Sequence, residues 1–438
     1  MPPLILVLAQ LVVVLATARL VGRAVRVVGQ PQVVGEMIAG VILGPSVLGG
    51  LAPRAWATLF PPASLGFLGL LSQLGLILFM FLVGLELDTA SLRRQGTAAL
   101  AISWSSIVAP FALGAALALW LHPSLAPAGI GELGFALFLG AAMSVTAFPV
   151  LARILESRAL TRTPIGSLAI GCAAVDDVSA WLILAVVVSV VRAGDTASLF
   201  VTLGGTVAYV ALMLTVGARI LGRFGRRVAA NGTIEPAELA AVLVLMFVSA
   251  GITELLGIHA LFGAFLTGAA MPRDDRFRDA VALRFQDLLE ALLLPLFFAY
   301  TGLRTSLEGV AVDGTLFVAL GAILLVAVAG KFGGTILAAR VTGMSWRAGA
   351  LLGALLNTRG LMELVILNIG LDIGVISPTL FTLMVIMAVF TTIMTTPAVS
   401  WLARGLDEAR PAAPRPPRAG AAEGATAARG EPDIAGRR

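Results

Sequence analysis

Apolar stretches of about 20 residues recur along almost the whole chain, each bounded by Arg, Pro or Gly. A bilayer-spanning helix needs this length, because the hydrocarbon core is about 30 Å thick and a helix rises about 1.5 Å per residue. Only 13% of the residues are charged, against roughly 25% in a typical soluble domain. The pattern therefore predicts an all-α polytopic membrane protein and excludes a soluble globule.

The apolar stretches predict thirteen transmembrane helices in one membrane domain over residues 1–404. Arg residues gather in alternate loops, and only Arg54, Arg192 and Arg304 fall in the other set. Because positive loops stay in the cytoplasm, we expect an outside N-terminus and a cytoplasmic C-terminus in a bacterial cytoplasmic (inner) membrane. The expected spans are residues 4–22, 33–49, 64–87, 97–121, 133–155, 164–192, 198–222, 236–256, 258–271, 280–303, 312–340, 346–371 and 378–404.

The last segment, residues 405–438, is rich in Pro, Ala, Gly and Arg and predicts a disordered cytoplasmic tail. The net charge of +5 comes from scattered basic residues, so topology explains it and no nucleic-acid partner is expected. Cys172 is the single cysteine and neither histidine has a ligand partner at metal spacing. We therefore expect no disulfide, no cofactor and no enzyme.

Two expected helices are interrupted at membrane depth by polar or helix-breaking residues. One interruption is Ser144-Val-Thr-Ala-Phe-Pro149, and the other is Asn357-Thr-Arg-Gly360, seven helices later. Discontinuous helices at corresponding positions of two halves are typical of inverted repeats, here helices one to six and eight to thirteen. Unwound backbone at these places offers carbonyl groups and helix ends to an ion.

Asp176 and Asp177 lie in the middle of the apolar span 164–192. A charge at that depth costs about 2.5 to 3.5 kcal/mol, which favours a functional role over a carboxylate pair satisfied by neighbouring donors. Adjacent residues point about 100° apart on a helix, so one carboxylate can face an ion path while the other meets a cation on another helix. Low dielectric and mutual repulsion disfavour the charged form of at least one, so proton and metal cation can compete for the same oxygens.

Lys331 is the only lysine of the chain, and it lies inside the apolar span 312–340. A buried ammonium can lose its proton whereas a guanidinium practically cannot, so lysine suits a partner that is titrated or released. The alternative is a lysine that snorkels from a helix end or ties two helices together.

Further polar residues accompany the two interruptions. Arg359 and Glu363 are four residues apart on one helix face, which predicts an ion pair of structural importance beside Asn357 and Thr358. Ser144 and Thr146 carry neutral oxygens of the kind that hard monovalent cations accept. Serine and threonine in membrane helices also bond their own backbone, and the sequence leaves both alternatives open.

With these residues the chain resembles the monovalent cation/proton antiporter superfamily, in the branch of Kef-type and plant cation/proton exchangers. The resemblance covers about residues 4–404, and its motifs occur in the same order as in the family. They are Gly35-Glu-Met-Ile-Ala-Gly-Val-Ile-Leu-Gly-Pro45, Phe81-Leu-Val-Gly-Leu-Glu-Leu-Asp88, Ser144-Val-Thr-Ala-Phe-Pro-Val-Leu-Ala-Arg153, Asp176-Asp177 and Asn357-Thr-Arg-Gly-Leu-Met-Glu363.

The resemblance implies a homodimer in which each chain has a dimerisation domain and a six-helix core domain with crossed discontinuous helices. It also implies elevator-type alternating access. Asp177 resembles the family's ion- and proton-binding carboxylate, and Thr146 matches a position near the ion. Asp176 with Lys331 is similar to the pattern of electrogenic exchangers, in which this pair breaks when the ion binds.

The leading hypothesis is a secondary transporter that exchanges Na⁺ (or Li⁺) for H⁺, with two protons per sodium and with Asp177 and Asp176 as the sodium site. An exchanger of K⁺ for H⁺, or an electroneutral one, is the alternative with the same fold. From other classes we retain a cation channel or symporter and a membrane-embedded enzyme acting on lipid. A channel would need polar groups along a whole pore, and a lipid enzyme would need a nucleophile with its base, or a metal site, at the membrane interface.

Overall fold

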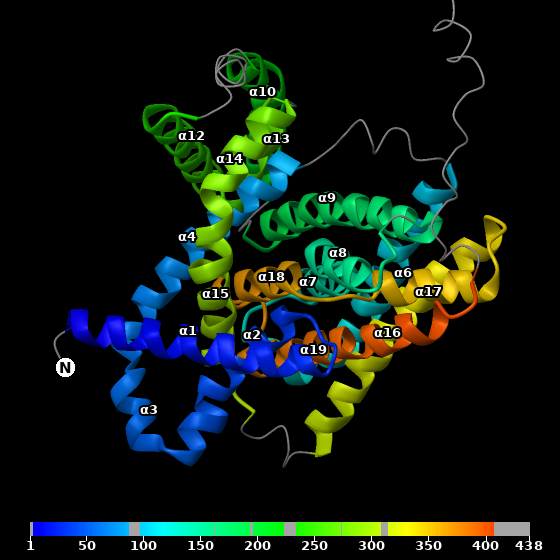
Figure 1. Cartoon of the computed structure of the whole chain (residues 1–438), viewed down its shortest axis with the longest axis horizontal. Helices are drawn as coiled ribbons and strands as arrows, with labels where there is room; N and C mark the ends of the chain where they lie inside the picture. Colours follow the sequence, from blue (N-terminus) through cyan, green and yellow to red (C-terminus); the bar gives the residue numbers. More distant parts are fainter. Residues whose placement is uncertain are drawn as a thin grey trace, which may run out of the picture.

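The computed structural model describes residues 3–86, 97–161, 163–192, 196–222, 234–272, 274–307 and 314–406. Within these ranges every regular element is a helix (Figure 1). The elements are α1 (Pro3–Val27), α2 (Gln32–Leu43), η1 (Pro45–Gly49), α3 (Pro53–Leu59), α4 (Pro62–Glu86), α6 (Thr97–Leu125), α7 (Glu132–Ser144), α8 (Phe148–Ser157), α9 (Pro164–Arg192), α10 (Thr196–Leu212), η2 (Met213–Gly217), α12 (Pro236–Leu255), α13 (Ala260–Ala270), α14 (Asp275–Leu288), η3 (Leu289–Leu293), α15 (Leu294–Leu303), α16 (Gly314–Val341), α17 (Trp346–Leu356), α18 (Leu361–Asp372) and α19 (Pro378–Leu402).

Ten stretches of the described chain are long and apolar enough to cross a membrane, and the bent pair α17 and α18 raises the number to eleven. The all-helical polytopic class is therefore confirmed. The two other expected spans, residues 258–271 and 280–303, fall on the 11-residue α13 and on the continuous helix α14–η3–α15. The count of thirteen membrane-spanning helices stays a prediction, and the predicted tail lies outside the described residues beyond 406.

Both predicted helix interruptions are present. Helix α7 ends at Ser144 and α8 begins at Phe148, whereas α17 ends at Leu356 and α18 begins at Leu361 with a bend of 48°. The two unwound segments touch, because the N–H of Ala147 donates to the carbonyl of Thr358 at 2.9 Å. Backbone groups freed by each break thus find partners in the other break, as groups away from water must.

The helices pack in two groups. Helices α6, α7, α9, α16, α17 and α19 contact one another around the two breaks, while α1, α2, α4, α12, α13 and α15 form a second set of contacts. In the second set, Gly84 of α4 lies against Gly268 of α13, and Gly40 of α2 lies against Gly302 of α15. A side chain at any of these positions would meet backbone of the facing helix, so glycine permits this close approach.

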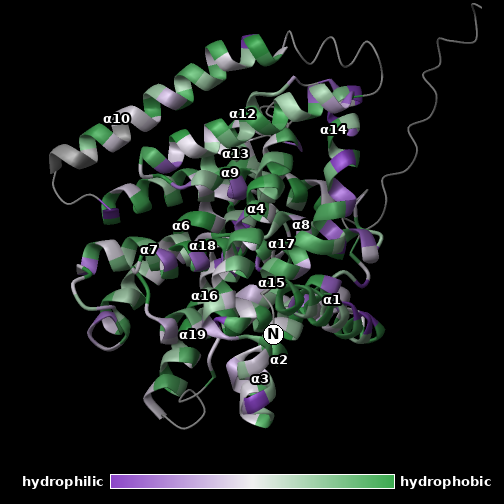
Figure 2. Cartoon of the chain, turned by 90° about the vertical axis from the view of Figure 1, so that its left-hand side faces the viewer, coloured by the Kyte–Doolittle hydropathy of each residue, from purple (hydrophilic) through white to green (hydrophobic). Residues whose placement is uncertain are grey.

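The outer surface of the helices is apolar, as Figure 2 shows by the predominance of hydrophobic colouring. Large apolar side chains lie exposed there, including Trp104, Phe200, Phe317 and Trp401. Contiguous apolar surface of this extent is rare on soluble monomers and is expected where lipid is the solvent.

Candidate functional site

Asp176 and Asp177 lie on α9 beside the two helix breaks, and both are buried, at 0% and 6% exposure. Consecutive residues on a helix point about 100° apart, so the two carboxylates face different surroundings. Asp176 points into a polar cluster contributed by three other segments, and Asp177 lines a large cavity.

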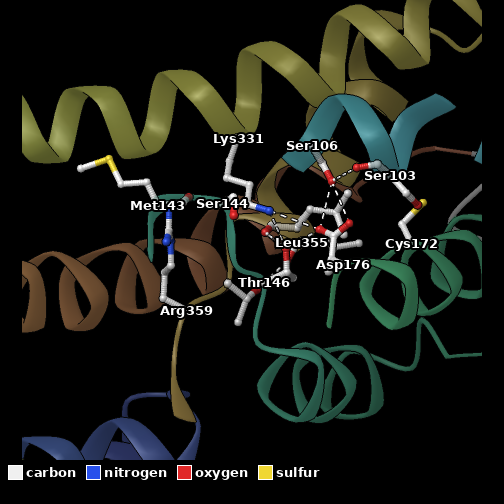
Figure 3. Close-up of polar contacts among 12 residues, drawn as sticks. Ser103, Ser106, Met143, Ser144, Thr146, Cys172, Asp176, Lys331, Leu355 and Arg359 are labelled. Carbon is white, nitrogen blue, oxygen red and sulfur yellow. Dashed lines mark hydrogen bonds and ion pairs between the residues drawn. The ribbon is translucent and has the colours of Figure 1, made fainter. Parts of the chain in front are cut away.

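The Asp176 carboxylate receives contacts from α6, from the α7–α8 break and from α16 (Figure 3). The hydroxyl of Ser106 lies 3.1 Å from Oδ1 and 3.0 Å from Oδ2. The hydroxyl of Thr146 lies 2.7 Å from Oδ2, and Nζ of Lys331 lies 3.2 Å from the same atom. A buried carboxylate is retained when it is paired with a cation and fully hydrogen-bonded, and Asp176 meets both conditions.

Lys331 is wholly buried on α16, where it donates to Oγ1 of Thr146 at 2.8 Å and pairs with Asp176. The neighbouring Gly330 lies against the backbone of Pro110 on α6, so α16 and α6 approach closely at this depth. The lysine therefore meets a carboxylate inside the protein, and the alternative of a snorkelling lysine is wrong for this structure.

Thr146 and Ser144 behave differently, although both belong to the same interruption. The Thr146 hydroxyl shares its one proton between Asp176 and the carbonyl of Leu356, 3.0 Å away in the second break. The Ser144 hydroxyl donates to the carbonyl of Ala141 at 2.8 Å, which is the local backbone bond common in membrane helices. Only Thr146 of the two hydrogen-bonds to Asp176.

Ser106 was not among the site residues expected from the sequence. It lies on α6 in the polar run Ser103-Trp-Ser-Ser106, within an otherwise apolar helix. Such a run at membrane depth is a signal, but Ser can also bond its own helix, and the Ser106 hydroxyl does lie 2.8 Å from the carbonyl of Ser103.

Asp177 faces a cavity of about 540 Å³ that reaches the protein surface between α1, α8 and α14–η3. Its Oδ1 has no hydrogen-bond partner among the described residues, while the N–H of Phe148 at the start of α8 donates to the carboxylate. At the mouth of the cavity, Arg153 and Glu290 form a half-exposed ion pair with a separation of 3.6 Å. Asp177 is thus the carboxylate of the pair that borders the cavity.

Arg359 and Glu363 form the ion pair that their spacing predicts, with Nη1 and Oε2 separated by 2.9 Å and both side chains fully buried. The arginine also donates to the carbonyls of Ala142 at 3.0 Å and Met143 at 2.6 Å. These carbonyls belong to the last turn of α7 and lack helical partners, so Arg359 caps a helix from the opposite break.

Thr358 and Asn357 occupy the start of the second break, and both are fully buried. The Thr358 hydroxyl donates to the carbonyl of Leu355 at 2.6 Å. The Asn357 side-chain amide has no protein partner within the described part of the chain. Asn357, Thr358, Arg359 and Glu363 therefore lie together at the second break. Among the described residues, none of the four forms a hydrogen bond with Asp177.

Replacing Arg359 with methionine is expected to destabilise the fold strongly. The substitution leaves two buried carbonyls and the Glu363 carboxylate without their donor, at about 1 to 3 kcal/mol for each unsatisfied group. Arg347→Met is the matched control, because Arg347 likewise has three acceptors, all carbonyls, but is exposed. Thermal unfolding in detergent should show a large drop in Tm for Arg359→Met and a small one for the control. Equal drops would contradict the capping role.

The donors assembled here are carboxylate, hydroxyl and carbonyl oxygens, which suit hard cations. Among the described residues there is no group of three or more His, Cys, Asp and Glu side chains that could hold a metal ion. Two touching helix breaks beside buried carboxylates, one of which opens to a cavity, define the class of secondary transporters.

Comparison with known proteins gives the family. The transmembrane domain family of sodium/hydrogen exchangers matches residues 12–405. The Na⁺/H⁺ antiporter NhaS4 of Synechocystis is 43% identical over 90% of this chain and 97% of its own length. The K⁺/H⁺ antiporter 1 of Saccharomyces cerevisiae is 33% identical over 90% of this chain and 46% of its own length. The chain belongs to the sodium/hydrogen exchanger family, within the monovalent cation/proton antiporter superfamily.

A further relative and a solved structure are also similar to this chain. Cation/H⁺ antiporter 17 of Arabidopsis thaliana is 39% identical over 90% of this chain, which spans 48% of that protein. The sodium proton antiporter MjNhaP1 of Methanocaldococcus jannaschii, solved at pH 8, superposes with a TM-score of 0.59 at 16% identity, over 91% of this chain and 97% of that one. That structure shares the fold.

Proposed function

We propose that this protein is a cation/proton antiporter that exchanges Na⁺ (or Li⁺) for H⁺ electrogenically. The observation that supports the proposal most directly is the unequal environment of the two adjacent carboxylates. Asp177 lines the cavity and its buried Oδ1 has no partner within the described chain, whereas Asp176 is held by Lys331, Thr146 and Ser106. Asp177 can therefore exchange a proton for a cation, while Asp176 and Lys331 determine the net charge of the site.

The proposed cycle balances as follows. Without the ion, Asp177 carries a proton and Lys331 is charged beside the Asp176 carboxylate, so the three groups sum to zero. When Na⁺ binds, Asp177 loses its proton, Asp176 turns to the ion and Lys331 gives up its proton, so the ion-bound site carries one negative charge. Two protons leave for each sodium, and one net charge crosses the membrane in each cycle.

We further propose that the group containing α6 to α9 and α16 to α19 is the six-helix core domain and moves as an elevator. Helices α4, α15 and α18 line both the large cavity and a second one of about 20 Å³. At the second cavity, Arg304, which directly follows α15, pairs with Asp372 of α18 at 2.7 Å. Asn368 also donates a hydrogen bond to Thr301 at 2.9 Å. These two contacts support an interface between the two helix groups that is closed at the small cavity and open at the large one.

The remaining assignments follow the same proposal. The chain functions as a homodimer in a bacterial inner membrane, with thirteen spans, an outside N-terminus and a cytoplasmic C-terminus. The cavity mouth at Arg19 and Arg153 then faces the cytoplasm, in agreement with the positive-inside rule. The α2, α4 and α15 group provides the dimerisation domain.

The test is proton movement in proteoliposomes of purified protein, followed with a pH-sensitive dye while Na⁺, Li⁺ or K⁺ is added. The membrane potential is clamped with potassium and valinomycin for Na⁺ and Li⁺, or with a proton-independent anion gradient for K⁺. We expect Na⁺-dependent exchange whose rate changes with the clamped potential. An exchange rate that does not change with the membrane potential would contradict the electrogenic mechanism and favour the electroneutral one.

K⁺/H⁺ exchange is the second candidate, because the similar yeast protein is named a K⁺/H⁺ antiporter. Ion size preference depends on the positions of the oxygens around Asp177 and not on the residue types. Potassium-driven exchange without a sodium response in the same assay would select this candidate. Cation flux that moves no protons would instead select the channel class.

A further inference from the structure

The large cavity holds a second buried carboxylate, that of Glu36 on α2, besides Asp177. The side chain of Glu36 is 5% exposed and borders the same cavity. Its helix is fixed on both sides, because Gly35 lies against Gly22 of α1 and Gly40 lies against α15 with no space for a Cβ. Glu36 therefore cannot turn away from the cavity into solvent by movement of α2 alone.

The partners of Glu36 leave part of its carboxylate free. Oε1 accepts a hydrogen bond from Nε2 of Gln32 at 2.9 Å, and no bond to Oε2 exists within the described ranges. The arginines nearby have other partners: Arg153 pairs with Glu290, and Arg19 donates to the carbonyl of Glu290 at 3.2 Å. Both arginines attract the Glu36 carboxylate electrostatically, but neither forms an ion pair with it within the described ranges. A buried carboxylate without a directly paired cation is costly in a membrane protein, so a mobile cation is a suitable partner.

The charges along the cavity fit such a partner. Its acidic lining groups outnumber the basic ones, which are two arginines. Low-dielectric walls focus the field of the acidic groups and raise the local concentration of cations. A carboxylate with one neighbouring amide binds a hard cation that keeps part of its water shell.

We propose that Glu36 is a staging site for the transported monovalent cation, occupied before the ion reaches Asp177. This inference rests on the proposed antiporter function and adds a residue that governs cation capture. Glu36 raises the occupancy of the cavity and takes no part in the coupling of protons to the ion. Its loss therefore weakens apparent affinity and leaves turnover intact.

The kinetic test compares Glu36→Gln, Glu36→Asp and wild-type protein in proteoliposomes, with N-methylglucamine chloride keeping the ionic strength constant. Glutamine fills the same volume, so packing is kept. We expect Glu36→Gln to raise KM for Na⁺ about tenfold with kcat within about twofold, and Glu36→Asp to recover most of the affinity. Glu132→Gln, an exposed carboxylate outside the cavity, serves as the control. An unchanged KM, or a fall in kcat alone, would overturn the proposal.

A binding readout independent of transport uses dicyclohexylcarbodiimide, which modifies protonated carboxyls in apolar surroundings, with mass spectrometry to measure modification at Glu36. In the Asp177→Asn variant, Na⁺ should slow this modification and N-methylglucamine should not. Modification that is insensitive to Na⁺ would reject the staging site. Absence of exchange in the wild-type protein would instead reject the antiporter proposal, so the two failures are distinguishable.

Discussion

Asp177→Asn is expected to reduce cation-dependent proton exchange to the level of protein-free liposomes. Asparagine fills the same space and still accepts the N–H of Phe148, but it can neither bind a proton nor neutralise a cation. Of the two adjacent aspartates, only Asp177 borders the cavity, so in the variant no carboxylate at this position alternates between proton and cation. The measurement is the dye assay in proteoliposomes, with Tm in detergent recorded for each protein.

Glu156→Gln is the matched control, since Glu156 is an exposed carboxylate on α8 and its loss should leave exchange unchanged. An Asp177→Asn protein with wild-type Tm and wild-type exchange would refute the assignment of Asp177. An Asp177→Asn protein that loses exchange and also shows a large drop in Tm would indicate a structural role instead.

Lys331→Met is expected to destabilise the protein by about 3 to 5 kcal/mol, because it leaves the Asp176 carboxylate buried without its cation. The double variant with Asp176→Asn and Lys331→Met should recover most of this stability, since it removes both charges and replaces an ion pair by groups of similar volume. Tm in detergent measures both effects. A double variant no more stable than Lys331→Met would show that the pair is not the source of the loss.

The same double variant should change the charge carried in each cycle. With Lys331 gone, the only proton exchanged for the ion is that of Asp177, so exchange becomes electroneutral. Clamping the membrane potential should then leave its rate unchanged, whereas the wild-type rate should respond. A potential-sensitive double variant would contradict the role of Lys331 as the second proton carrier.

The sequence predicted much of the fold because apolar length and helix-breaking residues are local signals. The span 164–192 coincides with α9, and both interruptions were located to within a few residues by Pro149 and Gly360. The continuous helix from α14 to α15 was predicted to begin later, at residue 280. The first turns of α14 carry several charges, so apolar length underestimates it.

The contacts between helices were harder to predict. In a bilayer nearly every helix face is apolar, so periodicity does not tell which helix lies beside which. Asp176 and Lys331 could be recognised because charges are rare at that depth, but their 3.2 Å contact joins residues 155 positions apart. The bonds from Arg359 to α7 span more than 200 residues, and no local pattern reports them. Spacing alone also left open which of the two aspartates meets the lysine.

The joining of the two helix breaks has a consequence for how such proteins can diverge. The N–H of Ala147, the hydroxyl of Thr146 and the guanidinium of Arg359 all bind groups of the other break or of the helix that leads to it. The spacing of oxygens at the crossing is therefore a property of the backbone, whereas in the proposed mechanism the charge transported depends on the side chains of Asp176 and Lys331. Under that mechanism, substitutions at these two positions change the charge coupling of a descendant protein while the backbone geometry of the crossing is inherited unchanged.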